Sequence, residues 1–164
     1  MREIGATLQQ LAEAFVGRVR GEREIALEIL LNRSALDYSL ASLEVVDRYL
    51  DDVHESVRPA RGWRGWFASK DIERSPELDK TIVRGGAYVG EVLRRAQPAW
   101  SWMDYDDFVL QDENAAKILG PRGIGTTALL VKANGSLTLP VNKVLRYLLE
   151  GSEHSTRHYV GSFM

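Results

Sequence analysis

Three aspartates in the stretch WMDYDDF are the residues of this chain whose types and spacing come closest to a catalytic or metal-binding pattern. Residues 99–105 have the aromatic and apolar character of a short strand, on which Asp104 and Asp106 would point to one face. Two carboxylates on one face are what a divalent cation or an acid–base pair needs. With Asp107, and with Glu91 from the preceding segment, they are the candidate catalytic residues. Carboxylates at a strand end are also commonly just solvated, and no histidine lies near them in the sequence.

Two histidines, His154 and His158, lie four residues apart near the end of the sequence. On a helix this spacing brings two imidazoles to one face, as in many zinc sites. The glutamate of an HExxH motif is absent, and the neighbouring sequence suggests no further ligand. We therefore expect residues 152–164 to be a frayed surface tail, with a metal site as the alternative. No bound metal ion or other cofactor is expected.

The stretch RGWRGW interleaves arginine with tryptophan, at Arg61, Trp63, Arg64 and Trp66. These two residue types dominate protein-interface hot spots, and they also stack on bases or clamp peptides. The four residues are therefore the candidate binding surface. The alternative is structural, since a long loop can bury two indoles simply to stay ordered.

The stretch GGAYVGEVLRR places three glycines, Gly85, Gly86 and Gly90, within what otherwise resembles a helix. A phosphate-binding loop of the form GxxxxGK[ST] is excluded, because Glu91 stands where the lysine must be. On a helical wheel Gly85 and Gly86 fall on the apolar face and Gly90 at its margin, with Arg84 and Glu91 opposite. We expect the glycines to admit the close approach of another backbone, with a helix break at Gly85–Gly86 or a ligand as alternatives.

The segments that must position these residues are helical first and β-rich later, which predicts an α+β fold. The N-terminal helices pack on a small antiparallel sheet that holds a tight hairpin at Asn134–Gly135, and a helix led by Pro140 and ended by Gly151 follows. The chain is expected to be one domain, residues 1–164, with an N-terminal helix, a core and a tail over 1–20, 36–151 and 152–164. The expected helices cover 1–20, 22–33, 36–56 and 75–97. The expected strands cover 99–105 and 107–111, and two β-rich runs within 126–141 flank Asn134–Gly135.

Size and charge exclude several classes of protein. The chain has 164 residues, a net charge of -2 and no long basic block, so nucleic-acid binding is not expected. It has no cysteine, which excludes disulfides and thiolate chemistry. No apolar run approaches the roughly 18 residues of a membrane-spanning helix, and the first residues lack the features of a secretory signal. A cytoplasmic protein without membrane attachment is expected.

Four sequence features follow one another in a recognisable order over residues 36–151. They are LDYSLASLEVVDRYL, the Gly-x-x-x-Gly-Glu pattern of GAYVGEVLRR, a tryptophan on the next strand, and the proline-led LPVNKVLRYLLEG. This order resembles small bacterial domains of unknown function. The resemblance implies the same order of helices and sheet, and it supplies no catalytic residues. Because some such domains are encoded beside toxin and secretion genes, it also implies an immunity-like or adaptor-like role.

The leading hypothesis is a non-enzymatic protein-interaction protein of bacterial type, with a toxin or another protein as partner. One alternative is a metal-dependent or other enzyme that uses Asp104, Asp106 and Asp107. Another is a small-molecule-binding domain with a groove between the helices and the sheet. The oligomeric state stays open.

Overall fold

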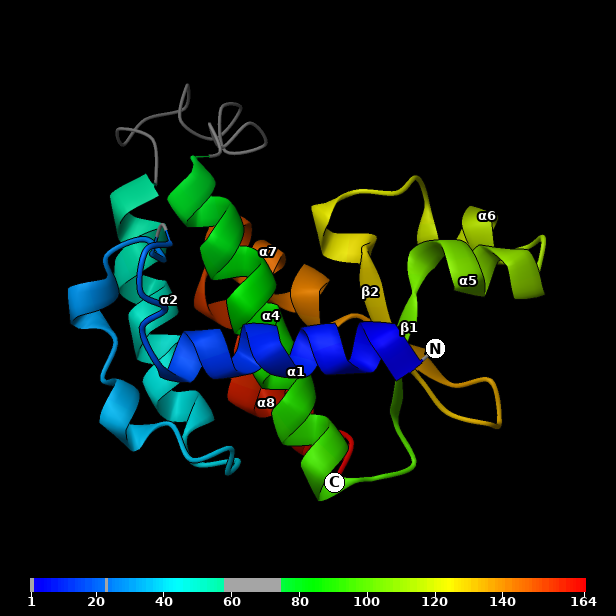
Figure 1. The fold of residues 1–164 in the computed structure, drawn as a ribbon, viewed down its shortest axis with the longest axis horizontal. Helices are drawn as coiled ribbons and strands as arrows, with labels where there is room; N and C mark the ends of the chain where they lie inside the picture. The colour runs from blue at the N-terminus through cyan, green and yellow to red at the C-terminus, as the bar shows by residue number, and fades with distance from the viewer. Residues whose placement is uncertain (1, 23, 58–74) are drawn as a thin grey trace.

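The structure, a computed structural model, describes residues 2–22, 24–57 and 75–164. Figure 1 shows a helical body beside a small sheet, with two short helices beyond the sheet. None of the helices in the described ranges is both long and apolar enough to cross a membrane. The elements are α1 (Arg2–Val16), η1 (Glu28–Leu30), η2 (Arg33–Ala35), α2 (Leu43–Val57), α4 (Pro76–Ala96), β1 (Ser101–Asp104), α5 (Tyr105–Gln111), α6 (Ala115–Leu119), η3 (Ile124–Thr126), β2 (Ala128–Val131), β3 (Leu137–Thr138), α7 (Pro140–Glu150), η4 (Ser152–His154) and α8 (Thr156–Gly161).

The glycine-containing helix α4 is the central element of the fold. It begins where the sequence predicts, because the Ser75 hydroxyl accepts the backbone N–H of Leu78 at 3.1 Å and Pro76 occupies the first turn. Helix α1 crosses it on one side and α7 packs on it from another (Figure 1). Side chains along nearly the whole helix from Leu78 to Leu93 are therefore buried.

The sheet has three antiparallel strands in the order β1-β2-β3, which confirms the α+β class. Trp102 of β1 pairs with Leu130 of β2. The hairpin between β2 and β3 is confirmed, but its turn is wider than expected. Lys132 N–H donates to the Ser136 carbonyl at 2.9 Å, which leaves three residues in the turn, and Gly135 has the positive φ of 86° that such a turn needs at its third position.

Two expected elements are wrong. Residues 22–33 do not form a helix: in the described part of this range there are only short 3-10 turns, and Leu27 breaks any helix with a φ of 47°. Residues 107–111 do not form a strand, because they belong to α5. The Asp104 carboxylate accepts the backbone N–H of Asp106 at 2.8 Å and so caps that helix.

The end of the chain is a packed element and not the frayed tail that we expected. Helix α8 contacts α2, and its Val160 is fully buried. The Asp47 carboxylate of α2 accepts the backbone N–H of Thr156 at 2.7 Å and the hydroxyl of Ser155 at 2.6 Å. The apolar core also extends beyond residues 36–151, because it includes Phe15 of α1 and Val160.

Candidate functional site

The three aspartates of WMDYDDF do not share one face. Asp104 ends β1 and caps α5, whereas Asp106 and Asp107 lie in the first turn of that helix. Asp106 is half-exposed and pairs with Arg122 at 2.7 Å. In the described parts of the chain these carboxylates do not converge with other ligand atoms as a metal site requires. The strand that was expected to align Asp104 and Asp106 is therefore replaced by a helix start.

Glu91, the fourth candidate, is completely buried instead of facing solvent. Its carboxylate accepts Trp102 Nε1–H at 2.8 Å and two N–H groups of Arg94, at 2.8 and 2.9 Å. Burial alone raises the pKa of Glu91, but the Arg94 and Trp102 hydrogen bonds outweigh burial and the net pKa is lowered. The ionised Glu91 carboxylate therefore links α4 to the sheet, and its oxygens accept hydrogen bonds from donors of the protein itself.

The glycines of α4 lie where neighbouring elements come closest. A Cβ built at Gly86 would lie 2.9 Å from Val141 Cγ2, and one at Gly90 would lie 3.2 Å from Pro140 Cγ and even closer to the Trp102 ring. A Cβ at Gly85 would make ordinary contacts of 3.6 Å. Gly86 and Gly90 thus let α7 and β1 approach the backbone of α4, and the helix is unbroken at all three glycines.

The tryptophan–arginine segment, with Arg61, Trp63, Arg64 and Trp66, lies outside the described residues. The candidate binding surface that rests on it stays a sequence-based prediction.

The α5–α6 hairpin, residues 105–119, is the described segment with the largest exposed aliphatic side chains at the sheet end of the molecule (Figure 1). Leu110 is 84% exposed and Ile118 is 72% exposed. The hydroxyl of Tyr105, at the start of α5, donates to the carbonyl of Gly120, just after α6, at 2.7 Å. The chain therefore leaves the sheet and returns at one place, and only Tyr105 and Ala115 within the hairpin are buried.

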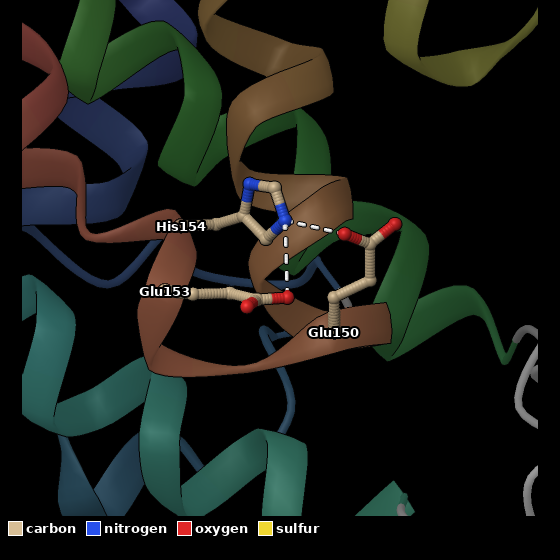
Figure 2. A group of neighbouring side chains, drawn as sticks. All are labelled: Glu150, Glu153 and His154. Carbon is tan, nitrogen blue, oxygen red and sulfur yellow. Dashed lines mark hydrogen bonds and ion pairs between the residues drawn. The ribbon is translucent and has the colours of Figure 1, made fainter.

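A second cluster lies at the end of α7, where Glu150, Glu153 and His154 bring their side chains together (Figure 2). One ligand atom from each residue lies within 4.8 Å of the other two. His154 Nε2 contacts the Glu150 carboxylate directly and lies 3.8 Å from Glu153 Oε1. Gly151, with a φ of 98°, reverses the chain between α7 and η4 and so makes this convergence possible.

Two basic side chains flank the cluster. Arg146 Nη2 donates to Glu150 at 2.9 Å, and Lys143 Nζ lies 3.4 Å from His154 Nδ1. Partial burial raises the pKa of Glu150, but Arg146 and His154 outweigh it and the net pKa is lowered. Burial, helped by the Arg146 charge, lowers the pKa of Lys143. One imidazole nitrogen and two carboxylates form a donor set that Zn²⁺ accepts.

His158 is not part of this cluster. It lies in α8, after Ser155, whereas His154 ends η4, so the two histidines do not share one helical face as their spacing had suggested. The sequence alone does not identify Glu150 and Glu153 as the neighbours of His154. Glu150 lies four residues before His154, a spacing that brings two side chains to one face of a continuous helix. Gly151 ends α7 between them, so this spacing did not predict their contact.

An open pocket of about 400 Å³ lies between α8 and the segment before α2. It is lined by Leu40, Ser155, Arg157, His158, Gly161 and Ser162. Its position differs from the groove between helices and sheet that a small-molecule-binding domain was expected to have.

The resemblance to small bacterial domains of unknown function, which rests on motifs over residues 36–151, stays a prediction. Neither protein-family models, nor curated protein sequences, nor solved structures gave a match to this chain.

Proposed function

We propose that this chain is a non-enzymatic protein-interaction protein and that it binds its partner through the α5–α6 hairpin. The observation that carries the proposal is the exposure of Leu110 and Ile118 on a segment that is nonetheless anchored at both ends. Apolar side chains in water are unfavourable by roughly 25 cal/mol per Å² relative to burial, and a partner surface would remove them from water. An immunity-like or adaptor-like role fits such a surface.

The hairpin is also acidic, which indicates the chemistry of its partner. Residues 105–119 contain four carboxylates, Asp106, Asp107, Asp112 and Glu113, against one basic residue, Lys117. All five are exposed. A segment that exposes two aliphatic side chains and four carboxylates is complementary to an amphipathic, basic surface, because opposite charges speed association and like charges repel. We therefore expect a partner with a basic apolar segment.

The double variant Leu110→Ser with Ile118→Ser is expected to fold normally and to lose its partner. Both side chains are mostly exposed, so the core is unchanged, whereas the binding contact loses two aliphatic groups. The measurement is quantitative affinity capture with tagged wild-type and variant chains from a lysate of the source organism. A protein that the wild-type chain captures should be depleted at least about tenfold with the variant. Capture should also weaken with added salt.

Two control variants locate the surface. Ile29→Ser removes a side chain that is 90% exposed on η1, outside the hairpin, and should leave capture unchanged. Trp66→Ala tests the tryptophan–arginine segment of the sequence analysis. If Ile29→Ser or Trp66→Ala abolishes capture while the hairpin variant retains it, the hairpin is not the binding surface. A wild-type chain that captures no protein beyond those seen with the hairpin variant contradicts the proposal.

A further inference from the structure

We propose that Glu150, Glu153 and His154 form a binding site for one divalent transition-metal ion, with Zn²⁺ as the best-suited ion. The site is independent of the α5–α6 hairpin, since it lies at the junction of α7 and η4. The sequence offered His154 no further ligand, but the fold supplies two.

The positions of the donor atoms suit a single ion. Zn²⁺ binds imidazole nitrogen and carboxylate oxygen at about 2.0–2.2 Å, so ligand atoms around one ion are separated by roughly 3–3.5 Å. His154 Nε2 is already in contact with Glu150 and is 3.8 Å from Glu153 Oε1. The side chain of Glu153 is 71% exposed, and small rotations of both glutamates would therefore bring all three donors around one ion without disturbing the core.

The donor types favour zinc over magnesium or calcium. Mg²⁺ and Ca²⁺ prefer all-oxygen surroundings, whereas an imidazole nitrogen suits zinc and its transition-metal neighbours. The two carboxylates balance the double charge of the ion once the ion replaces Arg146 at Glu150, and the exposed side of the cluster leaves room for water as the fourth ligand.

The neighbouring Lys143 is not the hydrogen-bond acceptor that a zinc-binding histidine normally has. A histidine that binds metal through Nε2 carries its proton on Nδ1, and that N–H normally donates to an acceptor. Here Nδ1 faces the amine of Lys143 at 3.4 Å, a group that donates when charged. Lys143 is therefore a positioning residue that holds the ring in place and weakens metal binding. A glutamine at this position would offer a carbonyl acceptor and remove the positive charge.

Isothermal titration calorimetry of the full chain with ZnCl₂ tests the site. The wild-type chain is expected to bind one ion per chain, and MgCl₂ should give no binding signal. His154→Ala should abolish the zinc signal, and Glu153→Gln should raise the Kd by at least about tenfold. Lys143→Gln should lower the Kd, by up to about tenfold, which loss of a merely structural contact would not produce.

His158→Ala is the matched control, because it removes an exposed histidine four residues away that is not in the cluster. It should leave zinc binding unchanged. The proposal is overturned if the wild-type chain binds no zinc, if zinc binding survives His154→Ala, or if His158→Ala weakens binding as much as His154→Ala. Because Glu153 is largely exposed, Glu153→Gln is expected to fold and tests the site even if His154→Ala does not fold. An unchanged Kd for zinc in Glu153→Gln would also overturn the proposal.

Discussion

Gly86→Leu is expected to lower the free energy of unfolding by about 3 kcal/mol and the melting temperature by roughly 10 °C. A Cβ at this position would lie 2.9 Å from Val141 Cγ2 and closer still to Val141 Cα, which belongs to the backbone of α7. A backbone atom cannot rotate away, so α4 and α7 would have to separate and lose their packing. Urea and thermal unfolding followed by circular dichroism measure the change.

The neighbouring glycine provides the control for Gly86. A Cβ at Gly85 would lie 3.6 Å from Phe15 Cε2 and Val144 Cγ1, which are ordinary contacts. Gly85→Ala should therefore raise stability by up to about 1 kcal/mol through helix propensity, while Gly86→Ala should lower it by about 1–2 kcal/mol. Equal effects of the two alanines would mean that close approach of α7 does not explain Gly86.

The parts of the fold that depend on adjacent residues could be predicted from the sequence. Ser75 and Pro76 define the start of α4, and Pro140 and Gly151 define the ends of α7, because capping and fixed proline geometry are local effects. The helix at 105–111 had the same kind of signal. Asp104 is a capping residue with two more aspartates in the first turn, a pattern that the β-rich side chains of residues 108–110 obscured.

The parts that depend on distant residues could not be predicted. Residues 22–33 have a helical pattern, but the backbone N–H of Ala26 donates to Thr81 Oγ1 and its carbonyl accepts the hydroxyl of Tyr49. These two contacts, to α4 and α2, replace the hydrogen bonds of a helix. Local propensity is a weak preference and tertiary contacts override it.

The helical wheel of α4 failed for the same reason. A wheel with one buried face assumes that a helix has neighbours on one side, whereas α4 contacts α1, α7 and the sheet. Arg84 and Glu91 are therefore buried on the side assigned to solvent. Arg84 Nη2 donates to the Glu22 carboxylate at 2.6 Å. Glu22 lies sixty-two positions away in the sequence, so residue spacing cannot predict this partner.

The Glu150–Glu153–His154 cluster likewise depends on the turn at Gly151.

Glu91→Gln is expected to lower the free energy of unfolding by about 2 kcal/mol at neutral pH. The carboxylate accepts three N–H groups from Trp102 and Arg94, whereas an amide would direct its own NH₂ at donors. Loss of one partner of a buried ion pair typically costs about 3–5 kcal/mol. The loss here should be smaller, because the Arg94 side chain is 37% exposed and water can solvate it. Urea unfolding at neutral pH measures it.

Glu44→Gln is the control for this variant. Glu44 also pairs with an arginine, Arg157, at 3.1 Å, but both side chains are about half exposed. Exposed pairs contribute little, so Glu44→Gln should change stability by less than about 0.5 kcal/mol. Similar losses for the two variants would show that burial does not give Glu91 its importance.

The dependence of the free energy of unfolding on pH below neutrality separates the effect of the Glu91 charge from the effect of its side-chain shape. Its pKa in the folded chain lies below the ordinary value of 4.5, so the ionised form is the one that the fold stabilises. That contribution is fully present above pH 4.5 and is lost as the pH falls through the lowered pKa of the folded state. The difference in stability between wild type and Glu91→Gln should therefore be constant near neutral pH and shrink below pH 4.5, because protonated glutamic acid resembles glutamine. A difference that stays constant or grows in acid would mean that the ionised carboxylate is not what links α4 to the sheet.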